Sequence, residues 1–172
     1  MQLYVIHPDP SACPRALDDV RLRAAVKESG QILSTALRKR GFQIEGLYKE
    51  AYPNHPCTAW ATRTLGNLEW TRRYFIACGR EYVHRFSKRH KSTQTLDNIY
   101  GLLIPGGADS MPRRPEHFCN AAANKERGFD FTHLPTFEAY KAYLNARWAA
   151  DDKQPTWTKR NAPEWAEVSW DG

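Results

Sequence analysis

The sequence has few cysteines, and none of them is placed to form a common metal or redox motif. Cys13, Cys57, Cys78 and Cys119 are far apart and include no C-x-x-C pair, which argues against a zinc ribbon and against a dense disulfide framework. The histidines form no H-x-x-x-H or H-E-x-x-H group, so we expect no metal site. This use of cysteine indicates a reduced, cytoplasmic setting.

Long apolar segments and nucleotide-binding motifs are also missing. No apolar run approaches the roughly 20 residues of a membrane helix, and residues 1–6 are apolar without the basic start of a signal peptide. The chain contains no Walker loop, no G-x-G-x-x-G and no G-x-S-x-G. We therefore expect a protein that has no membrane segment and uses no cofactor.

What the sequence does contain is enough apolar material for one folded unit. Its 172 residues are 41% hydrophobic and 12% aromatic, so a core can form without metal or disulfide cross-links. Apolar positions recur mostly at three- and four-residue spacing, which predicts a mainly α, compact single-domain fold. We expect a helical domain over residues 1–150, and an aromatic tail over 151–172 that packs on this domain or extends from it.

The periodicity and the punctuating prolines and glycines predict the individual elements. Residues 3–6 are expected to form a short strand or an extended arm. Residues 42–56 and 104–127 are rich in turn-forming residues and predict loops. The predicted helices are 14–40, 58–89 with a break near Gly66, 93–103, and 136–149 with Thr136 as its cap.

Much of the net charge of +6 lies in one segment, the basic stretch at residues 72–91. It holds seven lysines and arginines and two histidines against a single acid. On a helix these cations form a band wide enough to meet several backbone phosphates, whereas ordinary surface helices mix both signs. A solvated helix face is the alternative. The basic stretch predicts nucleic-acid binding, with Arg85, Lys88, His90 and Lys91 on the backbone.

Acids and arginines also alternate along the predicted helix at 14–40. Arg21 and Glu28 are two turns apart and share a face. A carboxylate beside arginines stays ionised at neutral pH and can stabilise a developing positive charge or relay protons. Surface ion pairs that contribute little are the alternative. Other charged or polar candidates on this helix are Arg15, Asp18, Asp19 and Gln31.

The third polar cluster is Asn54-His55-Pro56-Cys57, which is followed by Trp60. It closes a loop directly before a helix, where free backbone N–H groups suit a phosphate or an oxyanion. Asn54 could instead be only a turn residue. The functional interpretation places Asn54, His55 and Trp60 around a pocket, with the Trp60 indole available to stack on a base.

Taken in order, these residues resemble a family of small phage and bacterial proteins labelled pyrimidine dimer DNA glycosylase, or endonuclease V-like. The resemblance covers about residues 3–92, and as an ordered set its motifs are fairly specific. It rests on Asp9-Pro10 with Cys13, on Ala16-Leu17-Asp18-Asp19-x-Arg21-Leu22, on Glu28-x-x-Gln31-Ile32-Leu33-Ser34-Thr35-Ala36-Leu37, on Asn54-His55-Pro56-Cys57-x-x-Trp60, and on Glu81-Tyr82-x-x-Arg85-Phe86-x-Lys88-x-His90-Lys91-Ser92.

The resemblance implies a compact all-α enzyme in which an N-terminal amine attacks a deoxyribose carbon and forms an imine, assisted by a glutamate on a helix. An α-amine suits this role because its pKa of about 7.7–8.0 leaves a neutral fraction near neutral pH. Gln2 is too bulky for efficient removal of the initiator methionine, so Met1 or a lysine is expected to supply the amine. The resemblance leads us to expect an arginine followed by a glutamate on the first helix, but here Leu22 follows Arg21. We therefore expect a more distant acid, Glu28, to take the place of that glutamate. The predicted catalytic residues are Met1, His55 and Glu28, with Asp19 as the second choice of carboxylate.

Base excision is therefore the leading hypothesis: a pyrimidine-directed glycosylase/AP lyase-like enzyme acting on double-stranded DNA that is damaged or modified. The alternative is a phage transferase that attaches an amino acid, as co-substrate, to a phosphorylated hydroxymethyl thymine or uracil in DNA; it needs cations, a base and a pocket for an everted nucleotide. A non-catalytic DNA-binding module is the third hypothesis. A phage-encoded protein would act in the host cytoplasm. The predicted substrate contacts are Arg15, Arg21, Gln31, Asn54, Trp60, Arg85, Lys88, His90 and Lys91.

Overall fold

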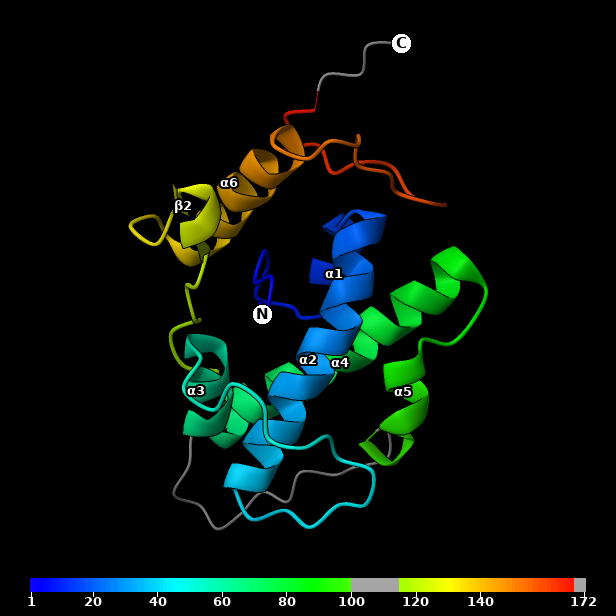
Figure 1. Ribbon diagram of the computed structural model, residues 1–172, viewed down its shortest axis with the longest axis vertical. Helices are drawn as coiled ribbons and strands as arrows, with labels where there is room; N and C mark the ends of the chain where they lie inside the picture. The colour runs from blue at the N-terminus through cyan, green and yellow to red at the C-terminus, as the bar shows by residue number, and fades with distance from the viewer. Residues whose placement is uncertain (100–114, 169–172) are drawn as a thin grey trace.

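The computed structural model is described for residues 1–99 and 115–168, and this part of the chain is mainly helical, as predicted. Two long helices, α2 and α4, pack against each other at the centre (Figure 1). None of the helices described is long and apolar enough to cross a membrane. The helices are α1 Cys13–Ala16, α2 Asp19–Lys39, α3 Pro56–Arg63, α4 Leu65–Phe86, α5 Lys91–Thr95 and α6 Thr136–Ala149, with 3-10 turns at Asp97–Ile99 and Lys125–Arg127.

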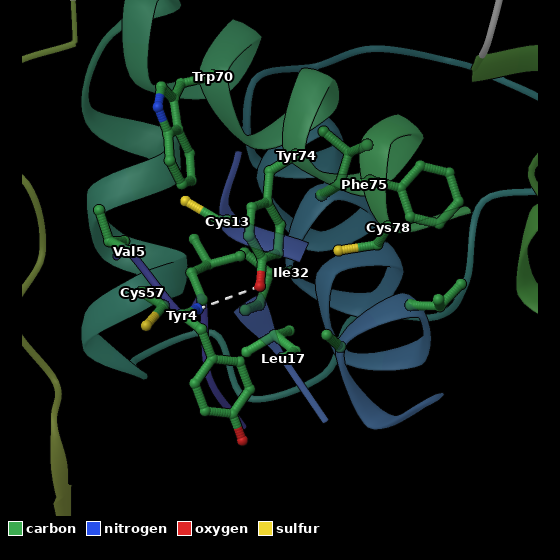
Figure 2. Close-up of a cluster of buried hydrophobic side chains, with 14 of the residues drawn as sticks. Tyr4, Val5, Cys13, Leu17, Ile32, Cys57, Trp70, Tyr74, Phe75 and Cys78 are labelled. Atoms are coloured by element: carbon green, nitrogen blue, oxygen red, sulfur yellow. Dashed lines mark hydrogen bonds between the residues drawn. The ribbon is translucent and has the colours of Figure 1, made fainter. Parts of the chain in front are cut away.

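The N-terminal residues form a buried extended arm, the second of the two forms predicted for them. Leu3 and Val5 are fully buried, and Tyr4 is nearly so. The Tyr4 backbone N–H donates to the Tyr74 hydroxyl at 3.2 Å, which fixes the arm against α4 (Figure 2). The arm therefore runs through the core, and this path sets where the start of the chain lies.

The two long helical segments predicted from periodicity are each divided by a cap that the apolar pattern did not reveal. The first segment breaks at Leu17, and Asp18 begins α2 by accepting a hydrogen bond from the Val20 N–H. The second breaks at Thr64, whose hydroxyl accepts from the Asn67 N–H at 3.0 Å, two residues before the predicted position near Gly66. Each break lets a short helix turn away from a long one.

The C-terminal part contains the helix predicted at 136–149 and a small hairpin that was not predicted. Strand β1 (Ala123–Asn124) pairs with β2 (Phe129–Asp130) in antiparallel register. The Thr136 hydroxyl donates to the Phe118 carbonyl instead of capping α6. Of the helix predicted at 93–103, residues 93–99 are described, and they form the end of α5 and the 3-10 turn after it. Residues 100–114, which include part of the loop predicted at 104–127, lie outside the described residues.

The segment after α6 folds back onto the start of α2 and the end of α4. We call residues 156–160 the C-terminal strap. Asp19 donates its backbone N–H to the Thr156 carbonyl at 2.8 Å. Trp157 is buried against Trp148 of α6, with ring centroids 5.1 Å apart. The Lys159 ammonium donates to the His84 carbonyl and the Ser87 hydroxyl at the end of α4. The strap therefore joins three helices.

Candidate active site

The N-terminal pocket is a cavity of about 460 Å³ beside the exposed end of the arm. Its walls come from the first residues of the chain, the outer face of α2, the start of α3, the turn after β1, and α6. It brings together residues that are distant in the sequence. The ionisable groups among its lining residues are Met1, Tyr4, Arg21, Glu28, His55, Lys125, Glu126, Tyr143 and Arg147.

Glu28 lies against the first peptide bond of the chain. Its Oε2 accepts a hydrogen bond from the Gln2 backbone N–H at 2.8 Å. The Gln2 side chain is 8% exposed; its Nε2 donates to the Ala121 carbonyl at 2.7 Å, and its Oε1 accepts from the Tyr140 hydroxyl. Because both ends of Gln2 are fixed, the start of the chain is held beside a carboxylate that the helix positions.

Arg21 contributes a buried cation whose charge is already balanced. Its guanidinium contacts the Asp18 carboxylate at 3.3 Å and that of Asp151 on its other side. Burial lowers the pKa of Arg21, but the two carboxylates outweigh it, so the pKa is raised. Asp18 is fully buried and also accepts from the Trp148 indole N–H at 2.9 Å. Arg21 therefore fixes α2 to the segment after α6 while lining the pocket.

Arg147 and Lys125 are pocket cations that the sequence interpretation missed. Arg147 donates from Nη1 to the Tyr143 hydroxyl at 3.2 Å. Its Nε is buried and has no hydrogen-bond partner among residues 1–99 and 115–168, while the residue itself lines the N-terminal pocket. The aromatic residues of α6 suggested only a core helix, and Lys125 stands beside the acid Glu126 in a segment predicted as a loop.

His55 shares the pocket but is also a helix cap. Its Nδ1 accepts from the Cys57 N–H at 3.2 Å, which begins α3 and leaves the other ring nitrogen for other partners. Asn54 is exposed and Gln31 half-buried, and neither is among the residues that line the N-terminal pocket. Of the polar cluster before α3, only His55 reaches this site.

The predicted DNA contact by Arg85 is wrong, because this side chain is 2% exposed. Its guanidinium donates to Glu81 Oε1 at 2.8 Å, to Asp19 Oδ1 at 3.1 Å and to the Leu17 carbonyl at 2.7 Å. It also donates to the carbonyls of Pro14 and Arg15. Arg85 is therefore the connection between α4 and the junction of α1 and α2.

Asp19, the second choice of catalytic carboxylate, belongs to the same buried network. It accepts from the Thr158 hydroxyl at 2.6 Å and from Thr156 and Arg85. Burial raises the pKa of the Asp19 carboxyl, but the hydrogen bonds from Thr158 and Arg85 outweigh it and lower the pKa. Since its oxygens are occupied and it does not line the N-terminal pocket, the structure favours Glu28 over Asp19.

The base stacking predicted for Trp60 is also wrong. Its indole is 2% exposed, donates to the His117 carbonyl at 2.9 Å and packs edge-on against Trp70. Lys88 and Lys91 are exposed, as a backbone contact requires. His90 is half-buried, and burial and the nearby Lys27 lower its pKa, so it is a poor cation near neutral pH. Its ring caps α5 by accepting from the Ser92 N–H.

The fold and the pocket together define a class: a helical protein whose N-terminal end is held against a helix-borne carboxylate inside a pocket rich in cations. Residues 1–95 match the family model described as pyrimidine dimer DNA glycosylase, and because this is more than half of the chain, the protein belongs to that family. No curated protein and no solved structure matches the chain. The family suggests a pyrimidine dimer DNA glycosylase-like function and a DNA substrate.

The match includes Met1, Arg21, Glu28 and His55, whereas the second half of the pocket lies beyond it. Lys125, Tyr143 and Arg147 come from residues after 95. Two parts of the chain therefore build one pocket, and only the first of them carries the family pattern.

Proposed function

We propose that the protein is a glycosylase/AP lyase-like enzyme that acts on a damaged or modified pyrimidine in double-stranded DNA at the N-terminal pocket. The observation that carries this proposal is the 2.8 Å contact between the Gln2 nitrogen and Glu28, which places the chain terminus and a carboxylate in one cationic cavity. The family supplies the DNA substrate. The pocket supplies a nucleophile, a proton carrier and anion-binding groups.

In the proposed reaction a neutral amine attacks the C1′ carbon of the deoxyribose. The amine nitrogen forms a bond to C1′, and the bond from C1′ to the base breaks with its electron pair leaving on the base, which takes up a proton. The sugar ring then opens to give an imine. Glu28 is placed to accept the amine proton and to stabilise the positive charge on the imine. Water releases the product by hydrolysing the imine.

Three groups could provide the amine: the α-amine of Met1, the α-amine of Gln2 if Met1 is removed, and a lysine side chain. With Met1 present, its α-amine lies one residue from the Glu28 contact. If Met1 is removed, the Gln2 nitrogen becomes the amine and already lies 2.8 Å from the carboxylate. Lys125 is the lysine on the pocket wall. Arg147, which lines the pocket, would bind a phosphate or the departing base through its guanidinium.

Borohydride trapping on a duplex with one abasic site tests the amine chemistry directly. We expect a covalent adduct, and peptide mapping of the trapped protein should locate it on Met1, Gln2 or Lys125. Acetylating the N-terminus should abolish the adduct if a terminal amine reacts. Glu28→Gln should slow trapping by about 10²–10⁴-fold with unchanged DNA affinity, whereas Glu50→Gln, on an exposed loop, should have no effect. No adduct across a broad lesion panel would exclude the glycosylase proposal.

One observation also supports the group-transfer alternative. With Met1 retained, Glu28 faces a backbone amide, which is no nucleophile, so the carboxylate could instead accept a proton from an incoming amino acid. Mass spectrometry of DNA that carries phosphorylated hydroxymethyl pyrimidines, incubated with candidate amino acids, would detect the product. An unchanged DNA mass would count against transfer. Full activity of Glu28→Gln in both assays would favour a non-catalytic DNA-binding module.

A further inference from the structure

A second cavity, which we call the basic pocket, lies on the outer face of α4. It has a volume of about 490 Å³, within the usual range of about 300–1,000 Å³ for ligand sites. Its walls come from three distant segments: the region of α1, the length of α4, and the C-terminal strap. The cations around it are Arg15, Arg72, Arg73, Arg80 and Arg160, with His84 beside them.

Two of these arginines are held in place by carboxylates. Arg72 donates twice to Glu69, at 2.7 and 2.8 Å. Arg160 donates twice to Glu81, at 2.9 Å for each bond. Burial raises the pKa of the Glu81 carboxyl, but hydrogen bonds from Arg160 and from Arg85 outweigh it and lower the pKa. Glu81 therefore remains ionised near neutral pH, and the paired hydrogen bonds to Glu69 and Glu81 fix Arg72 and Arg160 in the pocket wall.

The other arginine side chains are not neutralised in this way. Within residues 1–99 and 115–168, Arg15, Arg73 and Arg80 have no carboxylate at ion-pair distance, and all three are exposed. Asp9 interacts with Arg73 at longer range, but its carboxylate accepts hydrogen bonds from Ser11. The basic pocket is thus lined by three cations whose charge is left for an external anion.

The basic pocket is separate from the N-terminal pocket. The two cavities have no lining residue in common. Along α4, Arg73, Arg80 and His84 follow helical spacing on one face, whereas Tyr74 and Cys78 are fully buried on the opposite face that packs toward α2. A ligand in one cavity would therefore leave the other cavity open.

We propose that the basic pocket is a second phosphate-binding site, which holds the sugar-phosphate backbone of DNA outside the segment that enters the N-terminal pocket. The proposal rests on the proposed function for its choice of DNA as the polyanion. Guanidinium groups suit phosphate oxygens because their donors match them in pairs. The strap adds Arg160 to this surface, so a segment beyond the family match completes the site.

The salt dependence of binding to undamaged duplex DNA tests the site without requiring catalysis. Log K falls with log salt by about 0.9 for each phosphate contact, so the double variant Arg73→Gln/Arg80→Gln should reduce the slope by about 1.8. The matched control is Arg63→Gln/Lys49→Gln, which removes two exposed cations away from both cavities; its slope should stay near that of the wild type. Equal thermal unfolding midpoints would show that both variants are folded.

Equal slopes for the pocket variant and the control would overturn the inference. A second result would also overturn it: the pocket variant no longer binds inorganic phosphate or pyrophosphate, but the salt slope for DNA is unchanged. The basic pocket would then bind a small free anion and not DNA. The proposed function is judged separately by the borohydride adduct of the wild-type protein. If the wild type forms the adduct and the pocket variant and control have equal salt slopes, only the second phosphate site is rejected. If the pocket variant has a reduced slope and the wild type forms no adduct, only the glycosylase proposal is rejected.

Discussion

Replacing Arg85 should destabilise the protein far more than it weakens DNA binding. In Arg85→Met the chain keeps an unbranched, shorter apolar side chain but loses the donors to Glu81, Asp19 and the Leu17 carbonyl. Removing one partner of a buried ion pair typically costs about 3–5 kcal/mol because the remaining charge is left unpaired. Here Arg160 and Thr158 still donate to the two acids, which places the expected cost near the lower end of this range.

A loss of about 3 kcal/mol should lower the thermal midpoint of a chain of this size by roughly 6–12 °C. Urea unfolding followed by far-UV circular dichroism would measure the free energy directly. Arg80→Met is the control on the same helix: its side chain is exposed and has no carboxylate partner among residues 1–99 and 115–168, so it should change stability by less than about 0.5 kcal/mol.

Arg85→Met should be the less stable of the two variants, but Arg80→Met should lose more DNA affinity when both proteins are measured in the folded state. Arg85→Met should bind undamaged duplex like the wild type, and Arg80→Met should bind more weakly. An Arg85→Met protein with an unchanged urea midpoint and a large loss of DNA affinity would refute the structural role and restore the predicted backbone contact. Arg85→Lys, which retains the charge, allows the same comparison if Arg85→Met does not fold.

Acid should destabilise the protein through the same network, since the pKa values of Asp19 and Glu81 are held below their ordinary values of 3.8 and 4.5. Their contribution is complete above about pH 5 and is lost as the pH falls through the lowered pKa values. His90, whose pKa is also lowered, adds a decrease that begins nearer neutral pH, so urea midpoints should decrease on acidification and most steeply below about pH 5; a midpoint that rises on acidification would contradict this. Trp60→Ala should cost about 3–5 kcal/mol in urea unfolding, and Trp60→Phe less, with unchanged DNA affinity of the folded protein. A loss of affinity in a stable Trp60→Phe variant would instead support base stacking.

The sequence was most informative where local rules decide the structure. The helix at 136–149 has the predicted bounds, and the long helices α2 and α4 follow their apolar periodicity. The break at Leu17 was missed, because a polar cap interrupts the backbone without interrupting the apolar pattern, whereas the break predicted near Gly66 lies two residues earlier, at Thr64. The hairpin at 123–130 was missed because its strands are two residues long, too short for any alternation to appear.

The candidate site was predictable only in its first half. Glu28, Arg21 and His55 stand in motifs, and the structure places them in one pocket with Met1. Arg85 and Trp60 stand in the same motifs and are buried, since a motif does not distinguish a residue that binds a ligand from one that fixes the scaffold. Lys125, Arg147 and Arg160 could not be found, because their positions depend on contacts between distant segments that leave no local pattern.

The C-terminal strap also joins parts of the chain that a ribosome makes far apart in time. Thr158 follows Asp19 by 139 residues, and Arg160 follows Glu81 by 79. At about 5–20 residues per second, these acids wait roughly 4–28 s for the donors that the strap supplies. During that interval Arg85 is the donor that the part of the chain already made can offer to both carboxylates. The portion that carries the family pattern therefore completes its buried ionic network only after nearly all of the chain has been made.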